Sequence, residues 1–558
     1  MTTDSTTPNQ ASVPSGAVFN QPPPLVDLDL FSANRPLVEA VKRSGASWAE
    51  SEIAQVGKFA GSAEAIELAR AANQNPPILR THDRYGHRID EVEFHPAWHE
   101  LMKYSVNHGL HALPWRDSRP GAHAARAAMF TIISQTEAGH GCPISMTSAI
   151  VPALRMQPEL AAEWEPLITS LEYDFGLRPP AQKAGLICGM ALTERQGGSD
   201  VRANTTTAQA IGPGGAGGEY TVTGHKWFCS APMSDLFLIL AQTDQGLSCF
   251  LLPRVLPDGS RNGIQIERLK DKLGNRSNAS GEILLTDAWA RMVGEPGRGV
   301  QTIVEMVNHT RFDCVIGATS GMRAGVEQAT HHAAHRSAFG RLLVDQPLMQ
   351  NVLADLCVES EAATVTMMRL AAAYDAAADD QHEAALKRNG TAIAKYWICK
   401  RWPAHAAESL ECLGGNGYVE DSGLPRLYRE APVLSIWEGS GNVICLDVLR
   451  VLTKEPDTLG AFFAEVDQAA GDNRQLDAAS SSLRAELGDV VAFEARARRI
   501  VERMALVLQA SLLVRFGAPE VADVFCASRL AGDWGNEFGT LQATGDFSSI
   551  IERHRPSA

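Results

Sequence analysis

The stretch Ile436-Trp437-Glu438-Gly439-Ser440-Gly441-Asn442 places one carboxylate between an indole ring and a turn of small residues. An apolar helical pattern follows at once, in Val443, Ile444, Leu446, Val448, Leu449 and Val451. Ser440 or Asn442 is expected to cap this helix, because either side chain can accept a hydrogen bond from a backbone N–H of its first turn. Gly439 and Gly441 allow a positive φ or the close approach of a ligand. The stretch therefore predicts a helix start that presents Glu438.

Glu438 has two possible roles on this pattern alone. It stands in a segment poor in other charges, beside a bulky aromatic ring. Partial loss of solvent would raise the pKa of such a glutamate towards the range in which a general base works well. The alternative is a structural role, in which the carboxylate stabilises the positive end of the helix dipole. Further motifs are needed to decide between them.

The composition describes a globular protein with several structural units. Its 558 residues exceed the size of one simple core and predict roughly three or four units. Hydrophobic residues make up 45% and charged residues 21%, which is typical of soluble folded chains. The net charge of −15 argues against a protein dominated by binding to nucleic acid or anionic membranes, although a local basic patch is compatible with it. No apolar run approaches the ~18 residues of a membrane span, so no membrane partner is expected.

The N-terminal residues and the cysteines indicate the cellular compartment of the protein. Residues 1–16 are rich in Ser, Thr and Pro and lack the basic and apolar regions of a secretory signal, so they are interpreted as a disordered tail. The ten cysteines are scattered without a C-x-x-C pair, which favours buried thiols in a reducing cytoplasm. The histidine pairs His95/His99, His108/His111 and His331/His335 can each share a helix face, but no further ligands accompany them, and no metal site is predicted.

The hydrophobic period changes twice along the chain. Residues 34–183 are mostly helical in pattern, and short strand-like runs begin near Leu186. They predict a small antiparallel sheet or barrel from the runs Thr205–Ala210, Tyr220–Thr223, Leu236–Ala241, Ser248–Leu252, Ile264–Ile266 and Ile283–Leu285. Gly212–Gly217 matches G-x-G-x-x-G formally, but a strand follows instead of a helix, so it is interpreted as a long hairpin loop.

Helical patterns return from about residue 299. One helix is expected to start at Pro347, and a second to run from about Thr391 to Leu413 with a kink at Pro403. The sequence Gly414-Gly415-Asn416-Gly417 ends it. After residue 453 one strong amphipathic helix is expected through Leu487, Val490, Val491, Val501, Met504, Leu508 and Leu512.

Three arginines fall on one face of that last helix, namely Arg496, Arg499 and Arg503. Such a row can bind phosphates. It is equally compatible with a solvated outer face, because the segment as a whole is more acidic than basic.

Three further stretches offer groups suited to a flat heterocycle that carries phosphates. The loop Met190–Val201, with the sequence MALTERQGGSDV, supplies hydroxyls and backbone N–H groups. The run Lys226–Ser230 supplies aromatic rings and a hydroxyl after a strand. In His335–Gly340, Arg336 can pair with a pyrophosphate. Each also suits an ordinary turn, strand end or surface arginine, and it is their joint order that is informative.

With these motifs in this order, the chain resembles the acyl-CoA dehydrogenase family. The resemblance covers residues 186–452 through the M-A-L-T-E-x-x-G-G-S-D loop, the W-F-x-S strand, R-x-x-F-G, L-G-G-N-G and W-E-G-S. Further marks of one branch of the family are Val18-Phe19-Asn20-Gln21-Pro22, Phe94-His95-Pro96-Ala97-Trp98-His99 and the run Glu267–Ser280, ERLKDKLGNRSNAS.

The resemblance implies an α+β fold of the acyl-CoA dehydrogenase type. We expect a disordered or extended N-terminal arm (1–33), an N-terminal helical domain (34–185), a middle antiparallel β domain (186–298), a C-terminal helix bundle (299–452) and a helical extension (453–558). It also implies an FAD protein, usually a homotetramer. Glu438 falls at the catalytic-base position. The residues implied in FAD binding are Met190, Leu192, Thr193, Gly198, Ser199, Phe228, Ser230, Arg336, Phe339, Gly414, Gly415, Ile436, Trp437, Gly439, Ser440 and Asn442.

The family resemblance leaves the function open between two classes. One is an FAD-dependent dehydrogenase of acyl-CoA substrates, with a short or branched acyl group, because Trp437 replaces a smaller aromatic and is expected to narrow the acyl pocket. The other is a flavoprotein of the alkylation-damage response that binds double-stranded DNA and has weak or vestigial dehydrogenase activity. Its DNA-binding candidates are Arg450, Arg496, Arg499 and Arg503. A purely structural flavoprotein is a third possibility.

Overall fold

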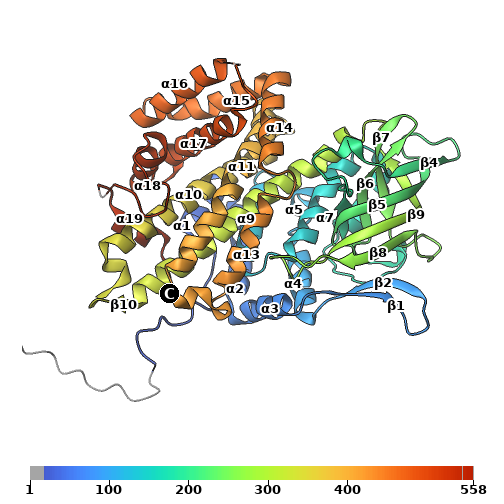
Figure 1. Cartoon of the computed structure of the whole chain (residues 1–558), viewed down its shortest axis with the longest axis horizontal. Coiled ribbons are helices and arrows are strands. Elements are labelled where there is room, and N and C mark those ends of the chain that lie inside the picture. The colour runs from blue at the N-terminus through green and yellow to red at the C-terminus, as the bar shows by residue number, and fades with distance from the viewer. Residues whose placement is uncertain (1–17, 490, 543, 557–558) are drawn as a thin grey trace, which may run out of the picture.

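The computed structural model describes residues 18–489, 491–542 and 544–556, so the tail predicted at residues 1–16 lies outside the described residues. Figure 1 shows a central mass of helices with a β domain at one end and a helical extension at the other. The first helices are α1 (Arg35–Arg43), α2 (Glu50–Ala60), α3 (Ala63–Gln74), α4 (Pro96–Asn107), α5 (Leu113–Arg116), α6 (Ala122–Thr136), α7 (Gly141–Leu154) and α8 (Pro158–Ile168). This agrees with the helical pattern of the sequence.

An antiparallel hairpin interrupts these helices and was not predicted. It consists of β1 (Ile78–His82) and β2 (Arg88–Glu93). Its strands are largely exposed, and apolar residues do not occupy every second position in them. They therefore lack the clear two-residue period that identifies a strand. Arg88 joins the hairpin to the β domain by donating to the carbonyl oxygen of Ile266 at 3.0 Å.

The β domain is a closed barrel, as the short strand-like runs suggested. Its strands are β3 (Cys188–Ala191), β4 (Thr207–Ile211), β5 (Glu219–Ser230), β6 (Leu236–Thr243), β7 (Gly246–Pro253), β8 (Ile264–Leu269) and β9 (Ser280–Val293). Pairing runs from β4 through β5, β9, β7 and β6 and returns to β4 at Thr207 and Gln242. The Gly-rich loop does join β4 to β5 as a hairpin.

Two details of the β domain differ from the sequence-based expectation. β3 and β4 both pair with β6 in parallel, so the domain is not purely antiparallel. β5 and β9 are also much longer than the runs Tyr220–Thr223 and Ile283–Leu285. The added parts include polar or charged residues, such as His225 and Lys226 in β5 and Glu282, Asp287 and Arg291 in β9, which interrupt the apolar runs and hide these parts from a search for them.

The helix bundle is built from α9 (Gly299–His335), α10 (Pro347–Ala376), α11 (Gln381–Glu411), α13 (Leu424–Leu434) and α14 (Gly441–Lys454). The short α12 (Gly415–Tyr418) and the hairpin of β10 (Ser337–Ala338) and β11 (Arg341–Leu342) connect them. Pro347 does start α10. α11 begins ten residues before the expected Thr391, because Asp380 caps it by accepting from the backbone N–H groups of His382 and Glu383.

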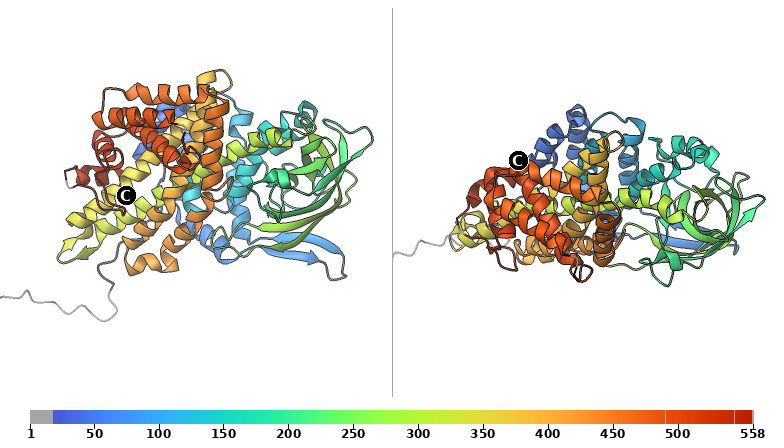
Figure 2. Two further views of the ribbon diagram at one scale, coloured as in Figure 1. Left: turned by 45° about the horizontal axis from the view of Figure 1, so that its top comes forward. Right: turned by 90° about the horizontal axis from the view of Figure 1, so that it is seen from above.

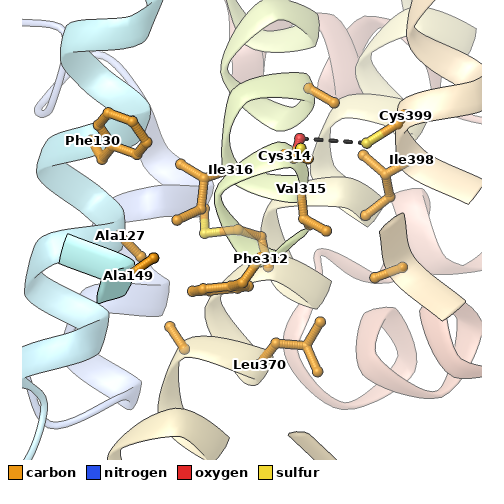
Figure 3. Close-up of a cluster of buried hydrophobic side chains, with 14 of the residues drawn as sticks. Ala127, Phe130, Ala149, Phe312, Cys314, Val315, Ile316, Leu370, Ile398 and Cys399 are labelled. Carbon is orange, nitrogen blue, oxygen red and sulfur yellow. Dashed lines mark hydrogen bonds between the residues drawn. The ribbon is translucent and has the colours of Figure 1, made fainter. Parts of the chain in front are cut away.

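The core of the bundle centres on α9. Figure 3 shows its side chains between those of α6, α7, α10 and α11, with Cys399 donating to the carbonyl oxygen of Cys314 at 3.4 Å. The labelled residues of this cluster are Ala127, Phe130, Ala149, Phe312, Val315, Ile316, Leu370 and Ile398. α9 therefore runs through the middle of the molecule and reaches both the β domain and the extension.

The C-terminal extension covers the bundle on the side away from the β domain (Figures 1 and 2). It contains α15 (Asp457–Val466), α16 (Arg474–Gly488), α17 (Ala497–Phe516), α18 (Pro519–Phe525) and α19 (Phe547–His554). The single amphipathic helix expected from Leu487 to Leu512 is wrong, because α16 ends at Gly488, and glycine is a poor helix former. Val490 of that expected helix lies outside the described residues.

The loop between β8 and β9 joins the three regions to one another. The backbone N–H of Asn275 donates to Glu430 Oε1 on α13 at 2.6 Å, and Ser277 Oγ donates to Glu137 Oε1 beside α6 at 2.6 Å. A side chain at Gly274 would stand 2.2 Å from the carbonyl oxygen of Arg429, so only glycine allows this approach. The ERLKDKLGNRSNAS stretch is thus a structural junction.

The end of the chain is held by charged groups that should make stability depend on pH. Glu361 on α10 accepts from Arg553 Nε at 2.9 Å and lies 3.0 Å from His554 Nε2. Burial opposes the charged form of His554, but Cys357 and Glu361 outweigh it and raise the pKa of His554 from 6.5 to about 9. Because the pKa is raised in the folded state, this stabilisation is complete below pH 6.5 and is lost as pH rises through about 9.

We therefore expect the free energy of unfolding to fall as pH rises from 6.5 to 9, and to fall less in His554→Gln. Urea unfolding at several pH values measures it. Identical pH profiles for the two proteins would contradict the assignment.

Candidate active site

A cavity of about 610 Å³ lies where the three regions meet. Its wall near the β domain combines the α6–α7 segment, the ends of β3 and β5, the middle of α9 and the turn before α14. The residues there include Phe130, Cys142, Met146, Met190, Ser230, Thr310, Cys314, Trp437 and Glu438. The residue predicted as the base therefore lines this cavity.

The backbone around Glu438 is strained and held by two cations. Glu438 has a φ of +58°, which lies in the left-handed region. A residue other than glycine loses about 1–3 kcal/mol of stability in this conformation. Arg311 Nε donates to the carbonyl oxygen of Glu438 at 2.9 Å, and Lys395 Nζ donates to the carbonyl oxygen of Gly439. Arg311 is held in turn by Asp447 at 2.7 Å. These contacts hold the main chain of the turn and do not engage the carboxyl group of Glu438, which interacts with Thr310 on the same cavity wall.

The surroundings of Glu438 favour its protonated form more than water does. Burial raises the pKa of Glu438 above its usual range, and Thr310, Arg311 and Lys395 only partly offset this effect. A carboxylate with a raised pKa binds a proton more strongly, which suits a group that must take a proton from carbon. Together with the strained turn, this favours the catalytic role over a purely structural one.

The expected caps of α14 are not formed. Ser440 occupies the N-cap position of α14, but its side chain makes no capping hydrogen bond. Asn442 Oδ1 accepts instead from Arg498 Nε at 2.7 Å. A charged donor from the neighbouring α17 replaces the backbone N–H in this contact, and it ties the extension to the turn. Gly439, with a φ of +110°, does use the positive φ expected of it.

The residues expected beside a flavin ring gather at one end of the barrel. Met190 on β3 lies opposite Ser230 on β5, and both line the cavity. Phe228 is two residues from Ser230 and is 48% exposed. Leu192 and Thr193 follow in the loop after β3, where a side chain at Gly198 would stand 2.4 Å from Thr193 Oγ1. Ser199 is exposed beside it.

A buried ion pair fixes this loop and was missed in the sequence. Lys226 Nζ lies 2.8 Å from Glu194 Oε1, and neither side chain is exposed. Glu194 also accepts from the backbone N–H groups of Thr205 at 2.7 Å and Thr206 at 3.2 Å. Although burial opposes it, these contacts lower the pKa of Glu194 to about 2. The sequence did contain an indication of this ion pair, because Glu194 lies inside the MALTERQGGSDV motif and Lys226 inside the Lys226–Ser230 motif.

The other implied cofactor residues lie away from this cavity. Arg336, Phe339, Gly414 and Gly415 are not part of its wall. Phe339 is 97% exposed, and open space surrounds the Cβ positions of Gly414 and Gly415. Arg336 Nη1 donates to the carbonyl oxygen of Asn20 at 2.7 Å. Ile436 is exposed as well. The contact of these residues with FAD, implied by the family resemblance, stays a prediction.

The arginines expected to meet DNA are already paired. Arg499 Nε lies 3.0 Å and Arg496 Nη1 3.7 Å from Glu486 Oε1, and Arg503 donates to the other oxygen of Glu486. Arg450 donates to Asp447. Glu486 thus offsets part of the positive charge on this face, and DNA binding there stays a prediction.

Three further properties of the described residues concern a metal site, disulfides and a membrane-spanning helix. Within residues 18–489, 491–542 and 544–556, no group of three or more His, Cys, Asp or Glu side chains is placed to hold a metal ion. All ten cysteines are free thiols, and nine of them are buried. Among the helices in this part of the chain, none has the length and apolar character required to cross a membrane.

Comparison with known families places this architecture. Residues 20–175 match the adaptive response protein AidB N-terminal domain. Residues 189–288 match the acyl-CoA dehydrogenase middle domain, and residues 297–453 match the acyl-CoA dehydrogenase C-terminal domain. The chain belongs to the acyl-CoA dehydrogenase family. This confirms the resemblance read from the motifs, as well as the fold expected from it.

Two relatives and one solved structure extend the likeness over three quarters or more of the chain. The putative acyl-CoA dehydrogenase AidB of Escherichia coli K12 is 46% identical over 514 residues, which cover 91% of this chain and 93% of that protein. Acyl-CoA dehydrogenase family member 11 of Caenorhabditis elegans is 32% identical over 76% of this chain and 70% of its own length. The structure of C. elegans ACDH-11 in complex with C11-CoA has a TM-score of 0.84 at 27% identity, covering 92% and 93% of the two chains.

As an acyl-CoA dehydrogenase family member, the protein is an FAD-dependent oxidoreductase, and the end of the barrel fits the cofactor. Met190 and Ser230 line the cavity, and Phe228 offers an exposed aromatic side chain two residues before Ser230 on β5. The loop after β3 leaves no room for a side chain at Gly198, and Gly197 has a φ of +119°. This backbone can approach a planar ring closely, as a flavin requires.

Proposed function

We propose that the protein dehydrogenates an acyl-CoA thioester between its α and β carbons, with Glu438 as the general base. The observation that carries this proposal is the carboxyl group of Glu438 on the cavity wall, with a raised pKa and a clamped, strained backbone. Glu438 would take the α proton. Bound FAD supplies the acceptor for the hydride that leaves the β carbon, so the acyl group loses two hydrogens and gains a double bond.

The residues around Glu438 would orient the substrate and exclude water. Arg311 and Lys395 bind the main chain of the turn, so the carboxylate itself stays available. Trp437 is adjacent to Glu438 in the turn, and Phe130 and Met146 add apolar surface to the wall of the same cavity. A dry wall strengthens the electrostatic effect of a single base and prevents side reactions. Met190 and Ser230 would hold the cofactor ring on the barrel side.

The choice of substrate, assembly and location is part of the same proposal. The similarity to ACDH-11, whose structure contains C11-CoA, supports an acyl-CoA substrate. Exposed apolar residues such as Phe339, Leu348 and Tyr418 support association into the homotetramer usual in the family, which light scattering would test. The free, mostly buried thiols suit a reducing cytoplasm.

Anaerobic titration of the purified protein with acyl-CoAs, starting with isovaleryl-CoA, tests the proposal through the flavin absorbance. Rapid bleaching by at least one saturated acyl-CoA supports it. Bound flavin that no acyl-CoA of any length bleaches would overturn it, and duplex DNA binding would become the next measurement.

The raised pKa of Glu438 predicts the pH dependence of the reaction. Only the ionised carboxylate can accept the α proton, and burial moves ionisation to a higher pH than in a free glutamate. The rate of flavin reduction should therefore rise with pH through a range above the usual carboxyl pKa and then level off. Rapid mixing under anaerobic conditions at a series of pH values measures this. A rate that stays flat down to the ordinary carboxyl range would contradict the raised pKa.

A further inference from the structure

The cavity continues from Glu438 along one face of α9. The residues of α9 on its wall recur at steps of three, four and seven, as Thr310, Cys314, Gly317, Ala324, Gln328 and His331. At a rise of about 1.5 Å per residue, the distance along the helix from Thr310 to His331 is about 32 Å. The cavity is therefore a long channel, and small residues at positions 314, 317 and 324 keep its α9 side open.

The N-terminal arm closes the far end of this channel. Pro22, Pro23, Pro24, Leu25, Val26 and Leu28 belong to the wall there. His331 Nε2 bonds to the carbonyl oxygen of Pro23 at 2.8 Å, which fixes the arm to the end of α9. Asn20 and Ser337 also exchange two hydrogen bonds, of 2.7 and 2.9 Å.

The far end of the channel suits a hydrocarbon better than phosphate groups. Leu25, Leu28 and Ile66 contribute apolar surface to it, beside the polar side chains of Asn73, Gln74, Gln328 and His332 and the acidic Glu327, which would repel a phosphate group. The arginines in this part of the wall are already bonded: Arg70 to Glu67, Arg429 to Glu420 and Arg426 to the carbonyl oxygen of Thr136. The polar half of a CoA ester would gain little there, whereas a methyl end would be removed from water.

We propose that the channel holds a long, straight acyl chain, with its thioester at Glu438 and its methyl end towards the N-terminal arm. The proposal rests on the proposed function and names its substrate class. An extended chain advances about 1.3 Å per carbon for C–C bonds of about 1.5 Å, so a palmitoyl chain needs roughly 20 Å, the distance from Thr310 to about Ala324. The arm residues then limit the longest chain that fits.

This substrate class differs from the short or branched acyl group expected from Trp437 alone. Trp437 stands beside the base and narrows the cavity only there, while the room for a longer chain lies along α9. One residue next to the reacting carbons therefore does not determine the length of the channel. The short or branched acyl group stays a prediction from Trp437.

Binding of butyryl-CoA and palmitoyl-CoA to Glu438→Gln protein, measured by calorimetry, tests the proposal without turnover. In this background Ala324→Phe should weaken palmitoyl-CoA about tenfold or more and butyryl-CoA less than about twofold, because the larger ring would fill a part of the channel that only the long chain reaches, and the displaced methylene groups would lose their burial. Leu25→Asp should act in the same direction. Phe19→Asp is the matched control, because Phe19 lies on the same arm, is exposed and is not part of the channel wall.

Equal losses for both chain lengths in Ala324→Phe and Leu25→Asp, or no loss for either, would overturn the channel proposal. Flavin content and circular dichroism confirm that the variants are folded. If length-dependent binding persists while no acyl-CoA reduces the flavin of the protein with Glu438 intact, the channel stands and the proposed dehydrogenation fails.

Discussion

Glu438→Gln should abolish reduction of the flavin by acyl-CoA while FAD stays bound. Removal of a general base typically costs 10²–10⁴-fold in rate, so we expect a loss of about 10³-fold. Other carboxylates of the cavity wall, such as Asp313 and Glu137, are already bonded to Arg126 and His140. Glutamine has the same length and can keep the clamped turn, because Arg311 and Lys395 bind main-chain oxygens rather than the carboxylate. Rapid-mixing absorbance under anaerobic conditions measures the rate.

The control for this variant is Glu455→Gln, an exposed glutamate just after α14. It should leave the rate of flavin reduction unchanged. If Glu438→Gln with normal flavin content reduced its flavin at the rate of the unmodified protein, Glu438 could not be the base.

Lys226→Met should cause the largest loss of stability, together with weaker FAD binding. The substitution leaves Glu194 buried without its partner, and breaking one side of a buried ion pair costs about 3–5 kcal/mol. Glu194 also orders the loop after β3 through the backbone of Thr205 and Thr206, so the flavin end of the barrel should loosen. Urea unfolding and FAD dissociation on dilution measure the two effects.

Arg80→Met is the matched control, because Arg80 pairs with Glu93 at 2.8 Å on the exposed hairpin. Loss of such a surface pair should cost less than about 1 kcal/mol. The double variant Glu194→Leu with Lys226→Met should recover part of the stability, since no unpaired charge remains buried. Similar losses in Lys226→Met and Arg80→Met would show that the buried pair has no special role.

Motifs with local geometry were predictable from the sequence. The Trp-Glu-Gly turn, the glycine loop after β3 and the aromatic end of β5 are each a short run of residues whose types indicate both shape and chemistry. The partners that hold two of these motifs are distant in the sequence, since Arg311 and Lys395 bind the turn and Lys226 pairs with Glu194 in the loop. The order of these motifs then identified the family, and the family supplied the fold. Met190, Ser230, Trp437 and Glu438 do share one cavity.

Features made by contacts between distant segments were not predictable. Arg498 reaches Asn442 from a helix some fifty residues further on, and Asn20 meets Arg336 across most of the chain. The break at Gly488 was missed because apolar spacing continued across it. In each case a distant partner or a single glycine outweighed the local pattern. The period of the apolar residues does not contain this information.

The junction loop between β8 and β9 has a consequence for how the protein melts. Asn275 and Ser277 bond at once to the bundle and to the N-terminal helices, so none of the three regions can unfold without breaking contacts in the others. Such coupling makes unfolding cooperative. Scanning calorimetry should therefore show these regions in a single heat-absorption peak, with flavin fluorescence released at the same temperature.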